Sequence, residues 1–188
     1  MTIKDTMTGK EAEKMPNLAF RMMAFIFNLR DIFFSIDKRL DSFGIKEGFV
    51  IVDYGCGTGS FIKRASKLVG ADGLVYAVDI HPLSIEAVSK KIIKNGLNNV
   101  KPLLADGYSC DISDNDADMI YALDMFHMIK NPSEFLQELH RILKKEGTLI
   151  IEYGHQPRAE AKAKIMGTQL WNITEEGLKH TRCQPIHS

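Results

Sequence analysis

The sequence has few of the residues that covalent or metal cross-links require. Its 188 residues include three cysteines, Cys56, Cys110 and Cys183, which lie far apart and form no C-x-x-C pair. A disulfide framework and a zinc site are therefore not expected, and a reducing cytoplasm is the natural compartment. The six histidines match no metal-ligand spacing either, so no metal is expected.

An excess of one charge and a long uncharged run are also missing. Lysine plus arginine number 24, as do aspartate plus glutamate, so no general affinity for nucleic acid is expected, and a local basic patch stays open. Charges near the N-terminus break up any secretory signal. The apolar stretch at 17–43 contains Arg21, Arg30 and Asp31, so it falls short of the roughly 18 uncharged residues of a transmembrane segment.

The 17–43 stretch is still the most apolar part of the chain. Asn17 is a candidate helix cap and Gly44 a candidate helix end, which together predict a helix across the stretch. Its apolar positions extend more than halfway round the helix. Three interpretations stay open: a helix packed on the domain, a flexible lid over an apolar substrate, or a membrane-surface helix, for which the basic face is sparse.

The organising motif lies at 49–61. Four apolar residues predict a buried strand that Asp53 ends. Gly55, Gly57 and Gly59 follow, and then a helical pattern begins. Strand, glycine turn and helix are typical of the opening of a nucleotide-binding βα unit.

Strands and helices alternate after this motif. Further strands are expected at 74–79, 100–105, 119–123 and 148–153. Pro82, Gly96 and the Asn131-Pro132 pair mark helix ends, and Lys144-Lys145 suit the end of the helix that contains Leu143. The alternation predicts a doubly wound, mostly parallel α/β sheet with helices on both faces.

The tail departs from this alternation. A helix at 158–166 precedes weak strands at 170–174 and 180–185, which predict an antiparallel hairpin at one edge of the sheet. The expected organisation is a single domain, 1–188, with an N-terminal helical segment or lid (1–45), a cofactor-binding core (46–155) and a C-terminal helix and hairpin (156–188).

Acidic residues distinguish between the possible nucleotide-like ligands. Ser60 occupies the third glycine position of the nicotinamide fingerprint, and no phosphate loop is present. Asp53, Asp79 and Asp106 each end or follow a strand, so all three should lie at the carboxyl edge of the sheet. Asp53 would repel a pyrophosphate but suits an amino group and a cationic sulfur.

Each acid then has a role in one ligand. A carboxylate at Asp79 can accept hydrogen bonds from both hydroxyls of a ribose, and Asp106 can accept one from the exocyclic amine of adenine. These roles together describe S-adenosylmethionine. Alternatives remain open, with Asp53 as a cap of the glycine turn and Asp106 as a turn former.

These motifs resemble the class I S-adenosylmethionine-dependent methyltransferases, and in particular the subgroup that methylates quinones, sterols, arsenite and other small molecules. The matching segments are VDYGCGTG (52–59), AVDI (77–80), LADG (104–107), ALDMFHMI (122–129) and LHRILKKEGTL (139–149). The resemblance implies a Rossmann-like seven-stranded sheet in which the terminal hairpin supplies one antiparallel strand. The cofactor-binding residues that it implies are Asp53, Tyr54, Gly55, Cys56, Gly57, Gly59, Asp79, Ile80, Asp106, Gly107, Leu123 and Asp124.

The expected reaction is methyl transfer to a small, apolar or aromatic acceptor. Asp124 and His127 follow the fourth strand and are candidate catalytic residues, although either can instead have a local structural role. Tyr153 and His155 are candidates for the acceptor pocket, and Cys56 is interpreted as a small filler of the turn. The arsenite enzymes use several cysteines, and Cys110 and Cys183 do not reproduce that arrangement.

Other functions fit less well. The Asn/Asp-Pro-Pro-Tyr motif for nucleic acid bases and the Pro-Cys nucleophile are both absent. An RNA or protein methyltransferase, a nicotinamide oxidoreductase and a non-catalytic module that binds the cofactor remain alternatives. A homodimer is possible.

Overall fold

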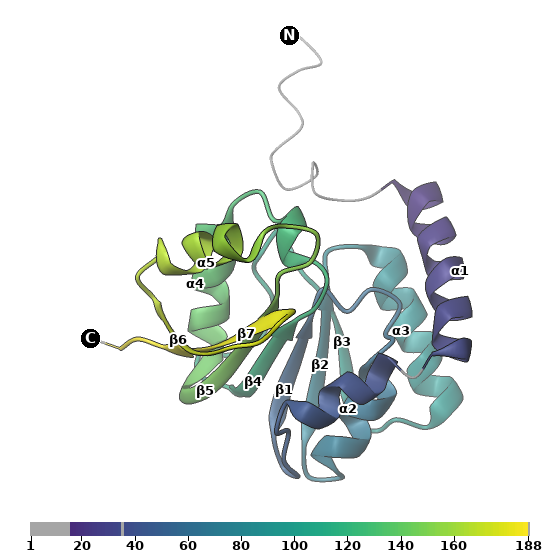
Figure 1. Cartoon of the computed structure of the whole chain (residues 1–188). Coiled ribbons are helices and arrows are strands. Elements are labelled where there is room, and N and C mark those ends of the chain that lie inside the picture. Colours follow the sequence, from purple (N-terminus) through teal and green to yellow (C-terminus); the bar gives the residue numbers. More distant parts are fainter. Residues whose placement is uncertain (1–15, 35, 188) are drawn as a thin grey trace, which may run out of the picture.

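A seven-stranded sheet forms the centre of the molecule (Figure 1). The computed structural model describes residues 16–34 and 36–187. The strands are β1 (Val50–Tyr54), β2 (Leu74–Asp79), β3 (Val100–Leu104), β4 (Ala117–Ala122), β5 (Leu143–Glu152), β6 (Trp171–Glu176) and β7 (His180–Pro185). Their order is β3-β2-β1-β4-β5-β7-β6. β7 is antiparallel to both neighbours and β1 to β5 pair in parallel, which confirms the predicted Rossmann-like sheet and its terminal hairpin.

Helices cover both faces of this sheet (Figure 1). They are α1 (Asn17–Phe33), α2 (Ile62–Val69), α3 (Pro82–Asn95), α4 (Pro132–Ile142) and α5 (Arg158–Met166), with the short 3-10 helices η3 (Ile36–Ser42) and η4 (Phe126–Met128). One apolar cluster joins α2, α3 and η3 to the sheet, and a second joins α4 and α5 to the opposite face. Burial on both faces explains why the central strands read as continuous apolar runs.

Most predicted helix ends are confirmed. Pro82 is the first residue of α3, and Gly96 follows that helix in the left-handed conformation at φ 61°. The Asn131 side chain accepts a hydrogen bond from the Glu134 amide at the start of α4. These residues begin and end the helices as their backbone and capping preferences predict.

The predicted helix across 17–43 is wrong in its extent. Pro16, and not Asn17, is the N-cap of α1, and the helix ends at Phe33. Phe34 is extended, with φ −128° and ψ 127°, and the 3-10 helix η3 follows, so Gly44 ends no continuous helix.

The junction of α4 and β5 was also predicted incorrectly. Leu143 is extended, with φ −77° and ψ 135°, and it pairs with Ala117 of β4. The Lys144 ammonium forms an ion pair with Asp118 at 2.7 Å. Strand pairing therefore takes these residues out of the helix, and β5 begins five residues earlier than the predicted start at Thr148.

The strand order determines where a ligand site can form. β1 lies between β2 and β4, so the chain builds the sheet outward from β1 to β3 and then returns to begin β4 on the other side of β1. Loops at the carboxyl ends of β1 and β4 diverge at this switch point and leave a crevice between them. Among the described helices, none has the length and apolar character needed to cross a membrane.

Candidate active site

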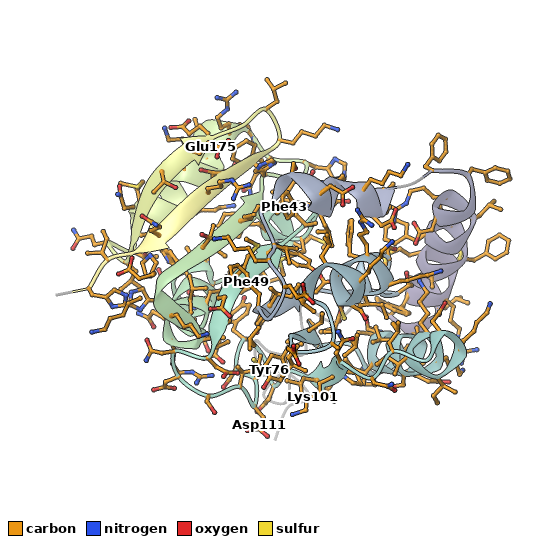
Figure 2. The ribbon with its side chains drawn as sticks, turned by 90° about the horizontal axis from the view of Figure 1, so that it is seen from below. Phe43, Phe49, Tyr76, Lys101, Asp111 and Glu175 are labelled. Atoms are coloured by element: carbon orange, nitrogen blue, oxygen red, sulfur yellow. The ribbon has the colours of Figure 1, made fainter. Side chains whose placement is uncertain are left out.

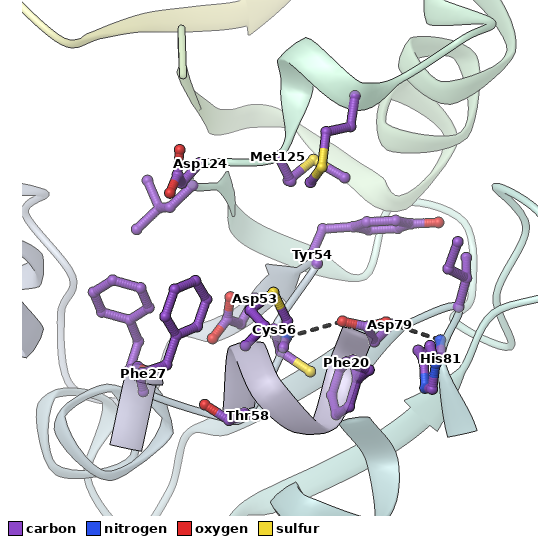
Figure 3. A pocket seen from close by; sticks show the side chains of 18 of the residues that line it. Phe20, Phe27, Asp53, Tyr54, Cys56, Thr58, Asp79, His81, Asp124 and Met125 are labelled. Atoms are coloured by element: carbon purple, nitrogen blue, oxygen red, sulfur yellow. Dashed lines mark hydrogen bonds between the residues drawn. The ribbon is translucent and has the colours of Figure 1, made fainter. Parts of the chain in front are cut away.

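A cavity of about 380 Å³ opens at the carboxyl ends of β1, β2 and β4 (Figure 3). This volume is in the range of small-molecule sites. Its walls come from the glycine turn after β1, the β2–α3 turn, the loop after β4, and the segment α1–η3. The predicted residues that line it are Asp53, Tyr54, Gly55, Cys56, Gly57, Asp79, Ile80, Gly107, Leu123, Asp124 and His127.

Two predicted site residues do not line the cavity. A Cβ atom on Gly59 would lie 3.1 Å from side-chain atoms of both Ile62 and Val88, so Gly59 lets α2 and α3 pack closely against the turn. Asp106 is exposed, and its backbone exchanges hydrogen bonds with Ser109 in a tight turn. Gly107 supplies the cavity wall in this loop.

Gly57 forms the open part of the glycine turn. Its φ of 53° is in the left-handed region, and a Cβ atom there would meet nothing within 4 Å. The missing side chain therefore leaves space that a ligand can fill against the backbone. The Gly57 amide donates a 2.9 Å hydrogen bond to Oδ2 of Asp79.

Asp79 joins two loops of the site. Besides the bond from Gly57, its Oδ1 accepts a 2.8 Å hydrogen bond from the His81 amide, and Figure 3 shows both contacts as dashed lines. Each carboxylate oxygen has about two acceptor positions, so both oxygens keep one for a ligand hydroxyl. The position and remaining capacity of this carboxylate suit a vicinal diol.

Asp53 is the buried acid of the cavity. It is only 2% exposed, and its Oδ2 has no hydrogen-bond partner among the described residues. Burial and the neighbouring Asp79 raise the pKa of Asp53 to about 8, although the nearby Tyr121 hydroxyl partly lowers it. A buried carboxyl with an unpaired oxygen is the expected complement of a cationic ligand group.

A rigid aromatic group supports the glycine turn from the other side. The Tyr54 hydroxyl donates a short hydrogen bond to the Tyr108 carbonyl, and burial raises the pKa of Tyr54, so the phenol stays neutral. The Tyr54 and Tyr108 rings meet Phe135 of α4 edge-on, with centroids 5.3 and 5.9 Å away. Two walls of the cavity are thus tied to the α4 core.

The N-terminal helix forms the roof. Phe20 of α1 stacks on the His81 ring at 4.2 Å (Figure 3), and Met23 and Phe27 line the cavity one and two turns further on. The Arg30 guanidinium lies 4.4 Å from the Phe27 ring centroid. We therefore find that one face of the apolar segment covers the site.

A cluster of polar groups follows β4. Asp124 has the left-handed φ of 55°, and its Oδ1 lies 3.8 Å from Nε2 of His155. The His155 ring meets the His127 ring edge-on at 5.0 Å. His127 Nδ1 is buried and finds no hydrogen-bond partner in the described part of the chain, and a Cβ atom on Gly154 would lie 2.1 Å from it.

Of the remaining candidates from the sequence, some line the cavity and others do not. His155 lines the cavity, whereas the Tyr153 hydroxyl donates to the His180 carbonyl at 3.1 Å and Tyr153 lines no part of it. Cys56 lines the turn, and burial raises the pKa of its thiol, as a filler requires. Among the described residues, no cluster of three or more His, Cys, Asp or Glu side chains could hold a metal ion.

Sequence reasoning missed several lining residues. His81 follows Asp79 at the end of β2, and Met125 follows Asp124 in the loop after β4, and these positions were an available signal. Phe20, Phe27 and Arg39 carried no such signal, because they come from the N-terminal segment. The other lining residues that were not predicted are Met23, Arg30, Ile36, Thr58, Ser60, Phe61, Tyr108, Met128 and Ile129.

The sequence of this chain was compared with protein families and with curated proteins. The sequence model of the family described as "Methyltransferase domain" matches residues 45–182. The ubiquinone/menaquinone biosynthesis C-methyltransferase UbiE of Pasteurella multocida is 26% identical over 176 residues, which cover 89% of this chain and 66% of that protein. The chain spans 41% to 66% of the length of such curated relatives.

Solved structures agree with this assignment. A SAM-dependent methyltransferase from Aquifex aeolicus is similar with a TM-score of 0.77 and 26% identity, over 92% of this chain and 100% of that one. A TehB-like SAM-dependent methyltransferase from Corynebacterium glutamicum has a TM-score of 0.72 over 91% of this chain and 100% of that one. At 18% identity it supports the fold alone. The chain therefore belongs to the methyltransferase-domain family, in the class I group whose cofactor is S-adenosylmethionine.

Proposed function

We propose that this chain transfers a methyl group from S-adenosylmethionine to a small, apolar aromatic acceptor. The observation that carries the proposal is the buried, unpaired carboxylate oxygen of Asp53, in the wall of a glycine-lined cavity beside Asp79. When bound, the cofactor supplies a methyl group on a sulfonium sulfur that is a good leaving group. The chain itself must bind the cofactor and the acceptor, orient the acceptor toward the methyl group, and exclude water.

The described residues fit this cofactor. Asp53 would hold the amino group of the cofactor. A cation there offsets the two effects that disfavour the ionised carboxyl, which are its burial and the negative charge of Asp79. Asp79 would hold the ribose hydroxyls with the acceptor positions left free by Gly57 and His81. Gly57 would let the ligand approach the backbone, since nothing occupies the place of its Cβ atom.

The acceptor side of the cavity is largely apolar. Met23 and Phe27 contribute from α1, and Met125, Met128 and Ile129 from the loop after β4. Thioether and aromatic side chains adapt to flat apolar rings. The curated relatives are named as C-methyltransferases of ubiquinone and menaquinone biosynthesis, and their names support a quinone-type ring as the acceptor.

Polar groups at one end of the cavity would orient the acceptor. A proton on His127 Nδ1 would be a buried donor without a partner, so the neutral ring should carry its proton on Nε2. His127 would then donate from Nε2 to an oxygen of the acceptor. Where the acceptor arrives protonated, Oδ1 of Asp124 can take that proton and pass it to Nε2 of His155 at the exposed mouth.

Ligand binding should release a proton from Asp53. With a pKa of about 8 this carboxyl is mostly protonated at pH 6.5, and it must ionise to pair with an ammonium group. We expect roughly one proton to be released per S-adenosylhomocysteine bound at pH 6.5. Calorimetric titration in buffers of different ionisation enthalpy measures this number. Asp53→Asn should release almost none, and a buffer-independent enthalpy for the unmodified protein would contradict the assignment.

The raised pKa also sets the sign of a stability effect. An unfolded aspartate has a pKa of about 3.9, so between about pH 4 and pH 8 the folded protein binds a proton at Asp53 that the unfolded chain has lost. The contribution of Asp53 to the free energy of unfolding therefore falls as the pH rises through this window. Asp53→Asn should remove that part of the pH dependence.

Gly154→Ala should lower turnover more than cofactor affinity. Its new methyl group would overlap His127 Nδ1, so the ring must move. The positive φ of 64° adds strain of about 1 kcal/mol. We expect kcat to fall at least about tenfold, because positioning errors near 1 Å are costly, while S-adenosylhomocysteine binds within about threefold of normal.

Gly48→Ala, at φ 81° with open space around it, controls for backbone strain. Equal losses of kcat in both variants would contradict the role of His127.

A transfer assay tests the proposed function directly. The full chain should be incubated with methyl-labelled S-adenosylmethionine and separate panels of aromatic quinone precursors, RNA and proteins. We expect label in an apolar aromatic compound. Label in RNA or protein alone would overturn the acceptor class, and cofactor binding without transfer to any panel would favour a non-catalytic module.

A further inference from the structure

The helix α1 has a second apolar face that points away from the cavity. Figure 2 shows side chains of this helix projecting from the edge of the molecule. We call this face the outer stripe, and its side chains are between 47% and 73% exposed. Its members are Leu18, Met22, Phe25, Ile26, Leu29, Phe33 and the adjoining Phe34.

The outer stripe is continuous. At about 100° per residue, its members on α1 fall within a sector about 100° wide. Phe20, Met23, Phe27 and Arg30, which line the cavity, lie on a different sector of the same helix. One helix therefore has an inner face that covers the site and an outer face that nothing in the described chain covers.

The area of the outer stripe matches a protein–protein contact. Large apolar side chains present about 150–200 Å² each, so seven of them at the observed exposures present on the order of 800 Å². A stable interface buries about 800 Å² on each partner. Monomeric proteins seldom expose a continuous apolar patch of this size.

The charges around the stripe favour an apolar protein partner over a lipid surface. Amphipathic helices that bind membranes carry a basic polar face. On α1, Arg30 is paired with Asp31 at 2.9 Å, and the positive charge of Arg21 acts on Glu86 of α3. The described residues of α1 therefore carry a net charge of only +1, from two arginines and one aspartate, which is a weak attraction for anionic lipid.

The attachment of α1 to its own core is thin. Phe20 is the one buried residue among those of α1 whose burial is described, and the polar link to the glycine turn is a 3.4 Å hydrogen bond from Arg30 to Ser60. A helix that covers a cavity through so few contacts would gain stability from a partner on its other side. Helical stability in proteins comes mainly from such packing.

We propose that the outer stripe pairs with the outer stripe of a second copy of this chain, and that this pairing holds α1 over the cavity. A two-fold contact uses the same patch on both subunits, so the partner needs no further surface. The pairing itself is independent of the proposed function, whereas its effect on ligand affinity depends on cofactor binding at the site.

Sedimentation velocity of the full chain tests the pairing. We expect a species of about twice 21.2 kDa at 50 µM protein. The double variant Phe25→Lys/Ile26→Lys should sediment as a monomer, because it buries charge at the centre of the contact. Leu178→Lys is the matched control, since Leu178 is 91% exposed outside α1, and it should remain a dimer. A monomeric native chain, or a double variant that stays dimeric, would overturn the proposal.

Two further measurements separate the alternatives. S-adenosylhomocysteine should bind at least about fivefold more weakly to the monomeric variant than to Leu178→Lys. Equal affinities would overturn the link between pairing and the roof while leaving the dimer in place. Co-sedimentation of a monomeric native chain with phosphatidylcholine vesicles would assign the outer stripe to a lipid surface instead.

Discussion

Asp79→Ala should weaken S-adenosylhomocysteine binding by at least about 100-fold. The substitution removes both oxygens that would accept the ribose hydroxyls, and hydrogen bonds to a charged group are worth about 1.5–3 kcal/mol each. It also leaves the amides of Gly57 and His81 without their acceptor, so the turn that faces the ligand loosens. Calorimetric titration below the melting temperature measures the affinity.

Two variants show whether this loss belongs to the site. Asp79→Asn keeps one carbonyl oxygen and should bind with intermediate affinity. Asp72→Ala removes an exposed carboxylate from the turn before β2 and should bind normally. Native affinity in Asp79→Ala would show that this acid does not hold the ligand, whatever its position in the cavity.

Phe135→Ala should cost about 3–5 kcal/mol of unfolding free energy, the usual range for a buried aromatic residue. The ring is fully buried in α4, and it contacts the rings of Tyr54, Tyr108 and Phe126. For a domain of this size the melting temperature should fall by roughly 6–20 °C. Because two of these partners form cavity walls, ligand affinity should fall as well.

Calorimetry of the ligand-free protein measures the loss of stability. Ile93→Ala is a suitable control, since Ile93 is 83% exposed on α3, and it should leave the melting temperature within about 2 °C. A shift of similar size in both variants would mean that the cluster around Phe135 does not support the domain as we describe.

The strands whose carboxyl ends form the candidate ligand site could be predicted from sequence. Asp53 and Asp79 fall near the ends of strands whose apolar runs and glycine punctuation are unambiguous, and parallel strands bring such ends to one edge. The short separation of the last two strands predicted their hairpin, and the resemblance to class I methyltransferases implied that this hairpin supplies an antiparallel strand. The strand ends and the hairpin depend on local patterns, so they need no knowledge of long-range contacts.

The roof and the helix junction could not be predicted in this way. Phe20 meets His81 across 61 positions, and a helix that is apolar on two faces does not show which face packs inward. Asp106 turns outward because of a tight turn with Ser109, which strand-end position alone does not predict. Leu143 leaves α4 for β5 because Ala117 pairs with it, and this contact is also long-range.

The steric relation between His127 and Gly154 has the same origin. The two residues are 27 positions apart and meet only because β4 and β5 are neighbours. Sequence placed His127 near the site but did not distinguish a base from a hydrogen-bond donor. The unpaired Nδ1 is the observation on which we base the proposed role of His127 as a hydrogen-bond donor from Nε2.

A crystal structure of the chain with S-adenosylhomocysteine would test the central claim most directly. We expect the amino group of the ligand within hydrogen-bond distance of Asp53 Oδ2 and both ribose hydroxyls on Asp79. Ligand bound elsewhere on the molecule, or a ligand in this cavity with its carboxylate and not its amino group against Asp53, would contradict the account.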